Sequence, residues 1–193
     1  SKKVRHVLNR TMNEEERVIA GPDLPSYEAQ ERHVLRNELV RTAVSKLSED
    51  TGQSTSELEA RASKLLQEIA ARFDVKYIKF LDGLLSIVFN KIYDGIICDR
   101  EGLKKVLDAS RKGPIVFCPC HRSHVDYLVL SHTLWQTGII PPHIAAGLNL
   151  SFFPLGHIFR RCGAFFLRRS FKGDILYSAV FRAYVIEILK AGT

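Results

Sequence analysis

The chain has 193 residues, of which 46% are hydrophobic and 25% charged, a composition that excludes intrinsically disordered and fibrous proteins. This length supports one domain, with or without a helical appendage, and is ample for a buried core. The formal net charge of +7 is unevenly placed, because residues 1–113 carry 20 basic and 18 acidic side chains whereas residues 114–193 carry 8 and 3.

The first part of the chain, residues 1–113, is expected to be a helical amino-terminal region. Residues up to about 25 carry charges and a Gly-Pro break, and we interpret them as an entry segment at the surface. Helical patterns run from Tyr27 to about Leu47 and from Ser54 to about Phe73. Ser54 and Glu57 have the spacing of a capping box, which predicts the start of the second helix.

The segment from Lys76 to Ile97 is the most apolar of the long helix candidates. Its polar residues, among them Asp82, fall on a narrow stripe, so most of the helix circumference is apolar. Such a helix is either buried between neighbours or laid into a membrane interface, and we expect burial. Charged residues interrupt it and the chain has no run of about 18 uncharged apolar residues, so the sequence predicts no membrane-spanning helix.

The second part, residues 114–193, alternates between strand and helix patterns. The expected elements are strands at Ile115–Cys118, His143–Gly147 and Ala164–Leu167, and helices at Asp126–Gln136, about Leu150–Arg161 and Ile175–Leu189. This order predicts an α/β fold in which a mainly parallel sheet with flanking helices follows the helical region. Ligands of such sheets gather at the carboxyl ends of the strands.

The turn after the first expected strand carries a candidate base and an orienting carboxylate. His121 and Asp126 stand five positions apart in Cys118-Pro-Cys-His-Arg-Ser-His-Val-Asp126. A histidine held by a carboxylate can take a proton from a hydroxyl, and the first turn of a helix offers N–H groups to a developing negative charge. The structural alternative is that Ser123 and Asp126 form a capping box without any catalysis. His124 is interpreted as a packed or solvated neighbour.

A cluster of basic residues lies around the last expected strand, with no acid before Asp174. Its members are Arg160, Arg161, Arg168, Arg169 and Lys172. We expect no nucleic acid as the partner, because the basic residues interleave with an apolar strand rather than line a groove with stacking rings. A small phosphate or an anionic bilayer surface fits this cluster better. The structural alternative is that these are ordinary solvated arginines at strand ends.

The four cysteines, Cys98, Cys118, Cys120 and Cys162, are predicted to be reduced thiols in a cytosolic setting. A disulfide framework would be typical of a short secreted chain with a signal peptide, which the first residues do not resemble. A zinc site is not expected either, because the available Cys and His residues at 118–124 are crowded together and lack a second pair at finger spacing.

Two blocks of residues resemble the glycerolipid acyltransferases, whose first block is His-x4-Asp and whose second is Gly-x-x-Phe-Ile-Arg-Arg. The matching segments are His121-Arg-Ser-His-Val-Asp126 and Gly163-Ala-Phe-Phe-Leu-Arg-Arg169, with Leu167 in place of the usual Ile. Similarity extends through Pro141-Pro-His-Ile-Ala-Ala-Gly147, Phe159-Arg-Arg161 and Phe171-Lys-Gly173. It is dense over residues 114–190, and it is greatest to the bacterial members that acylate glycerol 3-phosphate.

The resemblance implies transfer of a fatty acyl group from a thioester, on acyl carrier protein or coenzyme A, to the 1-hydroxyl of glycerol 3-phosphate, giving lysophosphatidate for phospholipid synthesis. His121 would be the general base and Asp126 would orient it. The residues implied in substrate binding are Gly163, Phe166, Arg168, Arg169 and Lys172, with the cationic ones on the phosphate. No metal, cofactor or covalent intermediate is implied. The implied location is peripheral, on the cytoplasmic face of the cell inner membrane.

The family's third block, Glu-Gly-Thr-Arg-Ser or similar, and its proline-bearing fourth block have no match in the chain. We therefore expect residues 114–193 to be the first part of an incomplete α/β acyltransferase domain, and the chain to be weakly active or inactive alone. Three alternatives stay open: acylation of dihydroxyacetone phosphate, a non-catalytic basic module that binds membrane or a partner helix, and transfer through Ser123 as a nucleophile.

Overall fold

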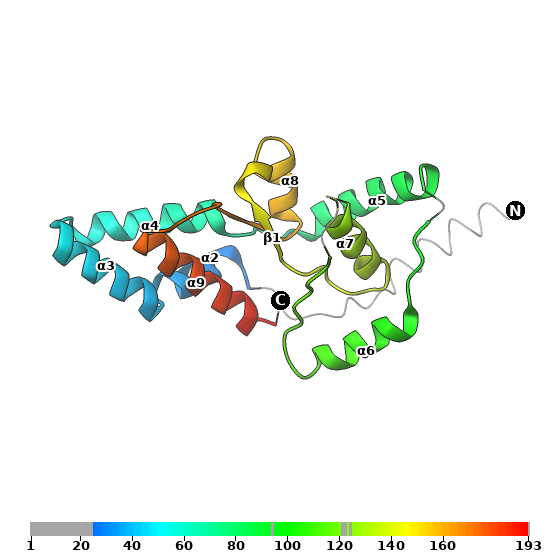
Figure 1. The fold of residues 1–193 in the computed structure, drawn as a ribbon, viewed down its shortest axis with the longest axis horizontal. Helices are drawn as coiled ribbons and strands as arrows, with labels where there is room; N and C mark the ends of the chain where they lie inside the picture. Colours follow the sequence, from blue (N-terminus) through cyan, green and yellow to red (C-terminus); the bar gives the residue numbers. More distant parts are fainter. Residues whose placement is uncertain (1–24, 94, 121–122, 124, 193) are drawn as a thin grey trace, which may run out of the picture.

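The computed structural model describes residues 25–93, 95–120, 123 and 125–192. Most of the expected entry segment, together with His121 and His124, lies outside them. The described part confirms an α/β fold in which helices predominate and flank a small parallel sheet (Figure 1). The elements are α2 (Tyr27–Leu35), α3 (Glu38–Thr51), α4 (Thr55–Ile69), α5 (Val75–Lys91), α6 (Arg100–Ser110), α7 (Asp126–Gln136), β1 (Ile144–Gly147), the 3₁₀ helix η1 (Leu148–Leu150), α8 (Leu155–Arg161), β2 (Ala164–Leu167) and α9 (Ile175–Lys190).

Side-chain caps set the ends of the first helices. The helix expected from Tyr27 to Leu47 is in fact two helices, because Asn37 interrupts it and caps α3 by accepting a hydrogen bond from the Leu39 N–H at 3.0 Å. The capping box of Ser54 and Glu57 is present as predicted at the start of α4. Helix α6 was not predicted from the sequence, although its capping residue, Asp99, is of a type that favours the start of a helix.

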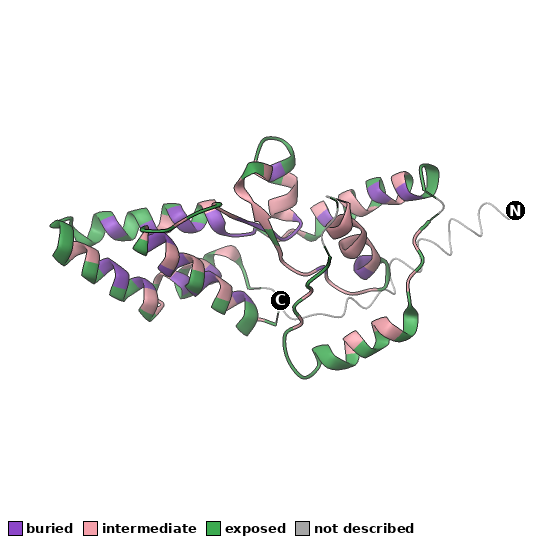
Figure 2. Ribbon diagram, viewed as in Figure 1, coloured by how far each residue is buried: buried purple, intermediate pink, exposed green. Residues whose placement is uncertain are grey.

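The main core lies between α2, α3 and α4 on one side and α9 on the other, as the buried residues in Figure 2 show. Two tyrosines of α9, Tyr177 and Tyr184, are fully buried. The Tyr184 hydroxyl accepts a hydrogen bond from the Ala71 N–H at 3.0 Å, and its ring lies edge-on to Phe165 of β2 at 5.6 Å. The last helix and the first helices therefore share one core, which also takes in one side of the sheet.

Strands β1 and β2 pair in parallel, with Ile144 opposite Ala164 and Gly147 opposite Leu167. Helix α8 lies in the connection between them. Gly163 directly precedes the second strand with φ +101°, and a Cβ at this position would stand 2.7 Å from the ring of Phe73. A side chain there would be strained both in backbone conformation and in space, so this glycine is required by the fold.

Two expectations for the second part of the chain are wrong in detail. Ile115–Cys118 is not a strand, because among the described residues β1 and β2 pair only with each other and no ladder includes this segment. The helix expected over about Leu150–Arg161 begins only at Leu155, as α8, with Pro154 directly before it, and Leu150 belongs to the separate 3₁₀ helix η1. Proline lacks an N–H and restricts the residue before it, so it favours the start of a helix over its interior.

Helix α5 is buried on one face only, so the expectation of burial between neighbours holds for half of its circumference. Its inner face contributes Ile78 to a smaller cluster with Trp135 of α7 and Cys162, which follows α8. The outer face leaves large apolar side chains exposed. Among the described residues, none of the helices has the length and apolar character needed to cross a membrane.

Candidate functional site

Of the candidate base, His121, and its orienting carboxylate, Asp126, the structure describes only the carboxylate. Asp126 is the first residue of α7, and its Oδ2 accepts a hydrogen bond from the Ser123 N–H at 2.8 Å. Because His121 lies outside the described residues, the distance between the imidazole and Asp126 stays a prediction.

Asp126 stabilises the turn before α7, but it does so without a complete capping box. The Oγ of Ser123 accepts a hydrogen bond from the Val125 N–H at 3.2 Å, and Val125, the residue before α7, makes no side-chain cap. The carboxylate of Asp126 thus fastens the turn while standing in the first turn of the helix, where main-chain N–H groups lack helical partners. Holding the turn and orienting an imidazole are compatible, because a carboxylate accepts several hydrogen bonds.

A mostly apolar cavity of about 830 Å³ opens beside this turn. Phe117 and Pro119 line it before the turn, and Tyr127 and Leu128 line it after the turn. Side chains of α5, α7, β1 and the end of α9 form most of the remaining wall. Its volume lies within the range of roughly 300–1,000 Å³ that is usual for ligand pockets, so it can enclose an apolar ligand whose reacting end is at the turn.

A second histidine–carboxylate pair lies in the cavity wall, and the sequence did not reveal it. Nδ1 of His132 lies 2.7 Å from Oδ1 of Asp82, a close contact without the alignment of a hydrogen bond, and the side chains are 10% and 14% exposed. The Gln136 amide donates to both oxygens of Asp82 at 2.9 and 2.7 Å. These groups join α5 to α7, and so they position the helix that begins with Asp126.

His143 is a further polar group of the cavity wall. Its Nδ1 is buried without a hydrogen-bond partner among the described residues, and its ring lies 5.7 Å from that of Phe73. Burial lowers the pKa of His143 from 6.5 to about 4. The ring is therefore neutral near pH 7 and lines the cavity as an uncharged group.

The burial of His143 predicts a pH-dependent stability. Between pH 6.5 and about 4 the unfolded chain binds a proton at His143 and the folded protein does not. Above pH 6.5 this titration should not affect the free energy of unfolding. As the pH falls from 6.5 to 4, we expect the free energy of unfolding to decrease by about 1–3 kcal/mol. Denaturant unfolding of the wild type and of His143→Phe at several pH values measures this loss of stability. The variant should lose less stability on acidification; equal slopes would contradict the assignment.

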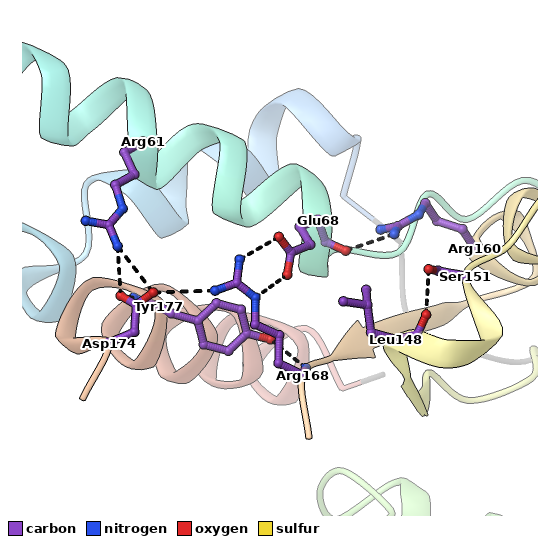
Figure 3. A network of polar contacts seen from close by, with 8 residues as sticks. All are labelled: Arg61, Glu68, Leu148, Ser151, Arg160, Arg168, Asp174 and Tyr177. Carbon is purple, nitrogen blue, oxygen red and sulfur yellow. Dashed lines mark hydrogen bonds and ion pairs between the residues drawn. The ribbon is translucent and has the colours of Figure 1, made fainter. Parts of the chain in front are cut away.

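Three of the five residues in the basic cluster are held by the protein itself. Arg160 donates to the main-chain carbonyls at the end of α4, and Arg161 pairs with Asp74 at 3.2 Å. Arg168 binds Glu68 through two hydrogen bonds of 2.6 and 2.7 Å, lies 3.4 Å from Asp174 and stacks over Tyr177 (Figure 3). The hydrogen bond to Glu68 also raises the pKa of Arg168.

The remaining two cations, Arg169 and Lys172, are exposed. Neither makes an ion pair or a side-chain hydrogen bond with any described residue. They follow β2, at the carboxyl end where ligands of parallel sheets gather. Of the residues predicted to bind a phosphate, these two have their charges available for a ligand.

The two uncharged residues predicted in substrate binding have packing roles in the structure. Gly163 permits the positive φ at the start of β2, and Phe166 is fully buried with the guanidinium of Arg160 over its ring at 4.7 Å. Direct substrate contact by either residue stays a prediction. The cavity lining includes neither of them, nor any of Arg168, Arg169 and Lys172.

The described cysteines are free thiols. Cys162 is buried, and burial raises its pKa to about 12, so it is unreactive, whereas Cys118 and Cys120 are exposed. Within the described ranges, no group of three or more His, Cys, Asp or Glu side chains is placed to hold a metal ion.

Comparison with known proteins shows similarity to acyltransferases. Residues 99–193 match the family model described as acyltransferase. The chain is 43% identical over 173 residues to a glycerol-3-phosphate acyltransferase of Haemophilus influenzae, an alignment that covers 89% of the chain and 21% of the relative. It is 40% identical over 198 residues to one of Shewanella woodyi, which covers 99% of the chain and 24% of the relative. The chain thus spans less than a quarter of the length of these relatives.

Proposed function

We propose, from the match of residues 99–193 to the acyltransferase family model, that this chain contributes the base and the phosphate-binding cations of a glycerol-3-phosphate 1-O-acyltransferase. The reaction transfers a fatty acyl group from a thioester to the 1-hydroxyl of glycerol 3-phosphate and yields lysophosphatidate. The donor is an acyl group on acyl carrier protein or coenzyme A. The glycerol-3-phosphate acyltransferases named above support the choice of acceptor, and the sequence blocks around His121 and Arg169 support the choice of residues.

In this mechanism His121 takes the proton of the 1-hydroxyl as its oxygen attacks the thioester carbonyl. A carbon–oxygen bond forms, the carbon–sulfur bond breaks, and the imidazolium returns its proton to the leaving thiolate. Asp126 holds the imidazole in the reactive tautomer and stabilises its cation. The position of Asp126 at the start of α7 supports this role, because its carboxylate accepts a hydrogen bond from Ser123, which is only two residues after His121 in the sequence.

We assign the phosphate of the acceptor to Arg169 together with Lys172. Both are exposed at the end of β2, and a guanidinium is well shaped for a phosphate. Arg168 has a different role in this proposal, because its guanidinium already binds Glu68 and Asp174. It fastens the segment after β2 to α4 and so positions its neighbour Arg169.

The observation that carries the proposal is the apolar cavity that Phe117 and Pro119 line before residues 121–126 and Tyr127 and Leu128 line after them. A fatty acyl chain in this cavity would place its thioester at the turn, beside the base. Ordered apolar walls position the chain, and holding reactants in place lowers the barrier of a bimolecular step. The reaction needs no metal or cofactor in this scheme.

We further propose that the protein attaches peripherally to the cytoplasmic face of the inner membrane. The net charge of +7 favours an anionic surface, and exposed large apolar side chains are available for the interface. The product of the proposed reaction is itself a membrane lipid, so attachment would deliver it where it is used.

The acceptor assay tests the proposed activity. A purified protein containing this chain is given labelled glycerol 3-phosphate, an acyl thioester and, in competition, an equal amount of dihydroxyacetone phosphate. We expect 1-acyl lysophosphatidate and free thiol in equal amounts. Preference for the keto acceptor would favour the related dihydroxyacetone-phosphate enzyme instead. A trapped acyl group on Ser123 would favour a serine nucleophile. Binding of phospholipid without turnover would favour the non-catalytic module.

A further inference from the structure

The outer face of α5 carries an apolar stripe bracketed by lysines. Phe80, Leu84 and Ile87 are 62%, 50% and 55% exposed, and their spacing of four and three residues places them on one side of the helix. Lys76 lies four residues before Phe80 and Lys91 four residues after Ile87, so one line along the helix reads Lys, Phe, Leu, Ile, Lys. Both lysines are exposed.

The opposite side of α5 carries the single acid of the helix. Asp82 points inward, where it contacts His132 in the cavity wall and accepts a hydrogen bond from Gln136. The exposed face therefore has no carboxylate within the helix, while Lys79 adds a third exposed positive charge beside the stripe. This separation of charge was not evident from the sequence, in which Lys79 and Asp82 are neighbours on the polar stripe.

The apolar surface continues beyond the last turn of α5. Ile92 is 72% exposed and Tyr93 is 51% exposed. A tyrosine suits the boundary between hydrocarbon and water, because its ring is apolar and its hydroxyl is polar. The whole surface is thus apolar along its middle and cationic at both ends, with a tyrosine next to one end.

We propose that this outer face of α5, defined by Lys76, Phe80, Leu84, Ile87 and Lys91, is the surface that docks on an anionic phospholipid bilayer. An interfacial helix buries its apolar stripe at the boundary between headgroups and acyl chains while its lysines reach the phosphates. The lysines at both ends of the stripe, and the lack of a carboxylate of α5 on this face, match an anionic lipid surface. An apolar protein partner would not require them.

The proposed docking has a geometric consequence for the site. The inner face of α5, through Ile78, Leu81 and Leu85, lines the apolar cavity, so the same helix would separate the bilayer from the cavity. The inference deepens the proposed membrane attachment and rests on it. It does not depend on acyl transfer, because lipid binding is measured without substrates.

Vesicle sedimentation tests the inference on a purified protein that contains this chain. The vesicles are pure phosphatidylcholine, or phosphatidylcholine with one quarter phosphatidylglycerol. We expect the combined change Phe80→Gln, Leu84→Gln and Ile87→Gln to weaken partitioning onto the anionic vesicles by about 100-fold, because three half-buried apolar side chains are lost from the interface. The combined change Lys76→Gln and Lys91→Gln should weaken it by about tenfold on anionic vesicles and leave binding to neutral vesicles unchanged.

A matched control on α9 replaces Ile175 and Ile186, which are 44% and 36% exposed, with Gln. This control should bind vesicles as the wild type does, and circular dichroism and Tm should show all three variants folded. Equal binding by the wild type and the Phe80, Leu84, Ile87 variant would overturn the inference and leave the attachment proposal standing. A wild type that binds no vesicles would overturn both, with the acceptor assay still able to succeed. If the wild type self-associates without lipid and the Phe80, Leu84, Ile87 variant does not, this face of α5 is a protein interface and the inference is overturned.

Discussion

Replacement of His121 by Ala is expected to lower kcat for acyl transfer by about 10²–10⁴-fold, the usual contribution of a general base. The reacting hydroxyl loses its proton acceptor, but the phosphate and the acyl chain keep their contacts. Glycerol 3-phosphate affinity and vesicle binding should therefore stay within about threefold of the wild type. Initial-rate kinetics together with calorimetric titration of the acceptor measure both quantities.

His33→Ala is the matched control for this experiment, because His33 is exposed and its one ion pair with a described residue is to Glu187 at 3.6 Å. It should retain full turnover. Asp126→Asn tests the orienting role separately, since the amide oxygen can still accept from the Ser123 N–H. We expect kcat to fall while KM is kept. Undiminished turnover in the His121 variant would show that His121 is not the base of the reaction.

Arg169→Met should change substrate binding and Arg168→Met should change stability, although the two residues are neighbours. Removing the exposed guanidinium of Arg169 takes a charge-assisted contact from the acceptor phosphate, and KM for glycerol 3-phosphate should rise about 10–100-fold with an unchanged Tm. Removing Arg168 leaves Glu68 and Asp174 without their shared cation. This pair is partly solvated, so the free energy of unfolding should fall by only about 1–2 kcal/mol.

Steady-state kinetics and denaturant unfolding of both variants distinguish these roles. Lys190→Met serves as the control for loss of a cation, since Lys190 makes only an exposed contact with Glu187 at 3.1 Å in the described part. An Arg168 variant with a KM as high as that of Arg169→Met, at unchanged stability, would contradict the division of labour. Both arginines would then bind the phosphate.

Local signals predicted much of the secondary structure. The bounds expected for α7, Asp126–Gln136, and for β2, Ala164–Leu167, are those observed, because a helical period and an apolar run are clearly delimited there. The strand expected at Ile115–Cys118 is wrong because an apolar run does not specify its partner, and a strand exists only through pairing. The break at Asn37 was missed because a capping residue inside a continuous helical pattern also fits a helix interior.

The candidate site was less predictable than the fold, since its contacts join distant parts of the chain. The bond from Gln136 to Asp82 spans 54 residues and that from Arg168 to Glu68 spans 100. No spacing rule connects such residues, so an arginine bound to protein and one available to a ligand look alike in the sequence. The structure separates Arg168 from Arg169 by showing which carboxylates approach them.

The contacts of Arg160 link the formation of two elements during folding. Its guanidinium supplies donors to the carbonyls of Gln67 and Glu68, 93 and 92 residues earlier in the chain. These carbonyls belong to the final turn of α4, which has no helical donors of its own. Water has to satisfy these carbonyls whenever α8 is not packed against α4, so we expect the helix end and the crossover to become ordered together.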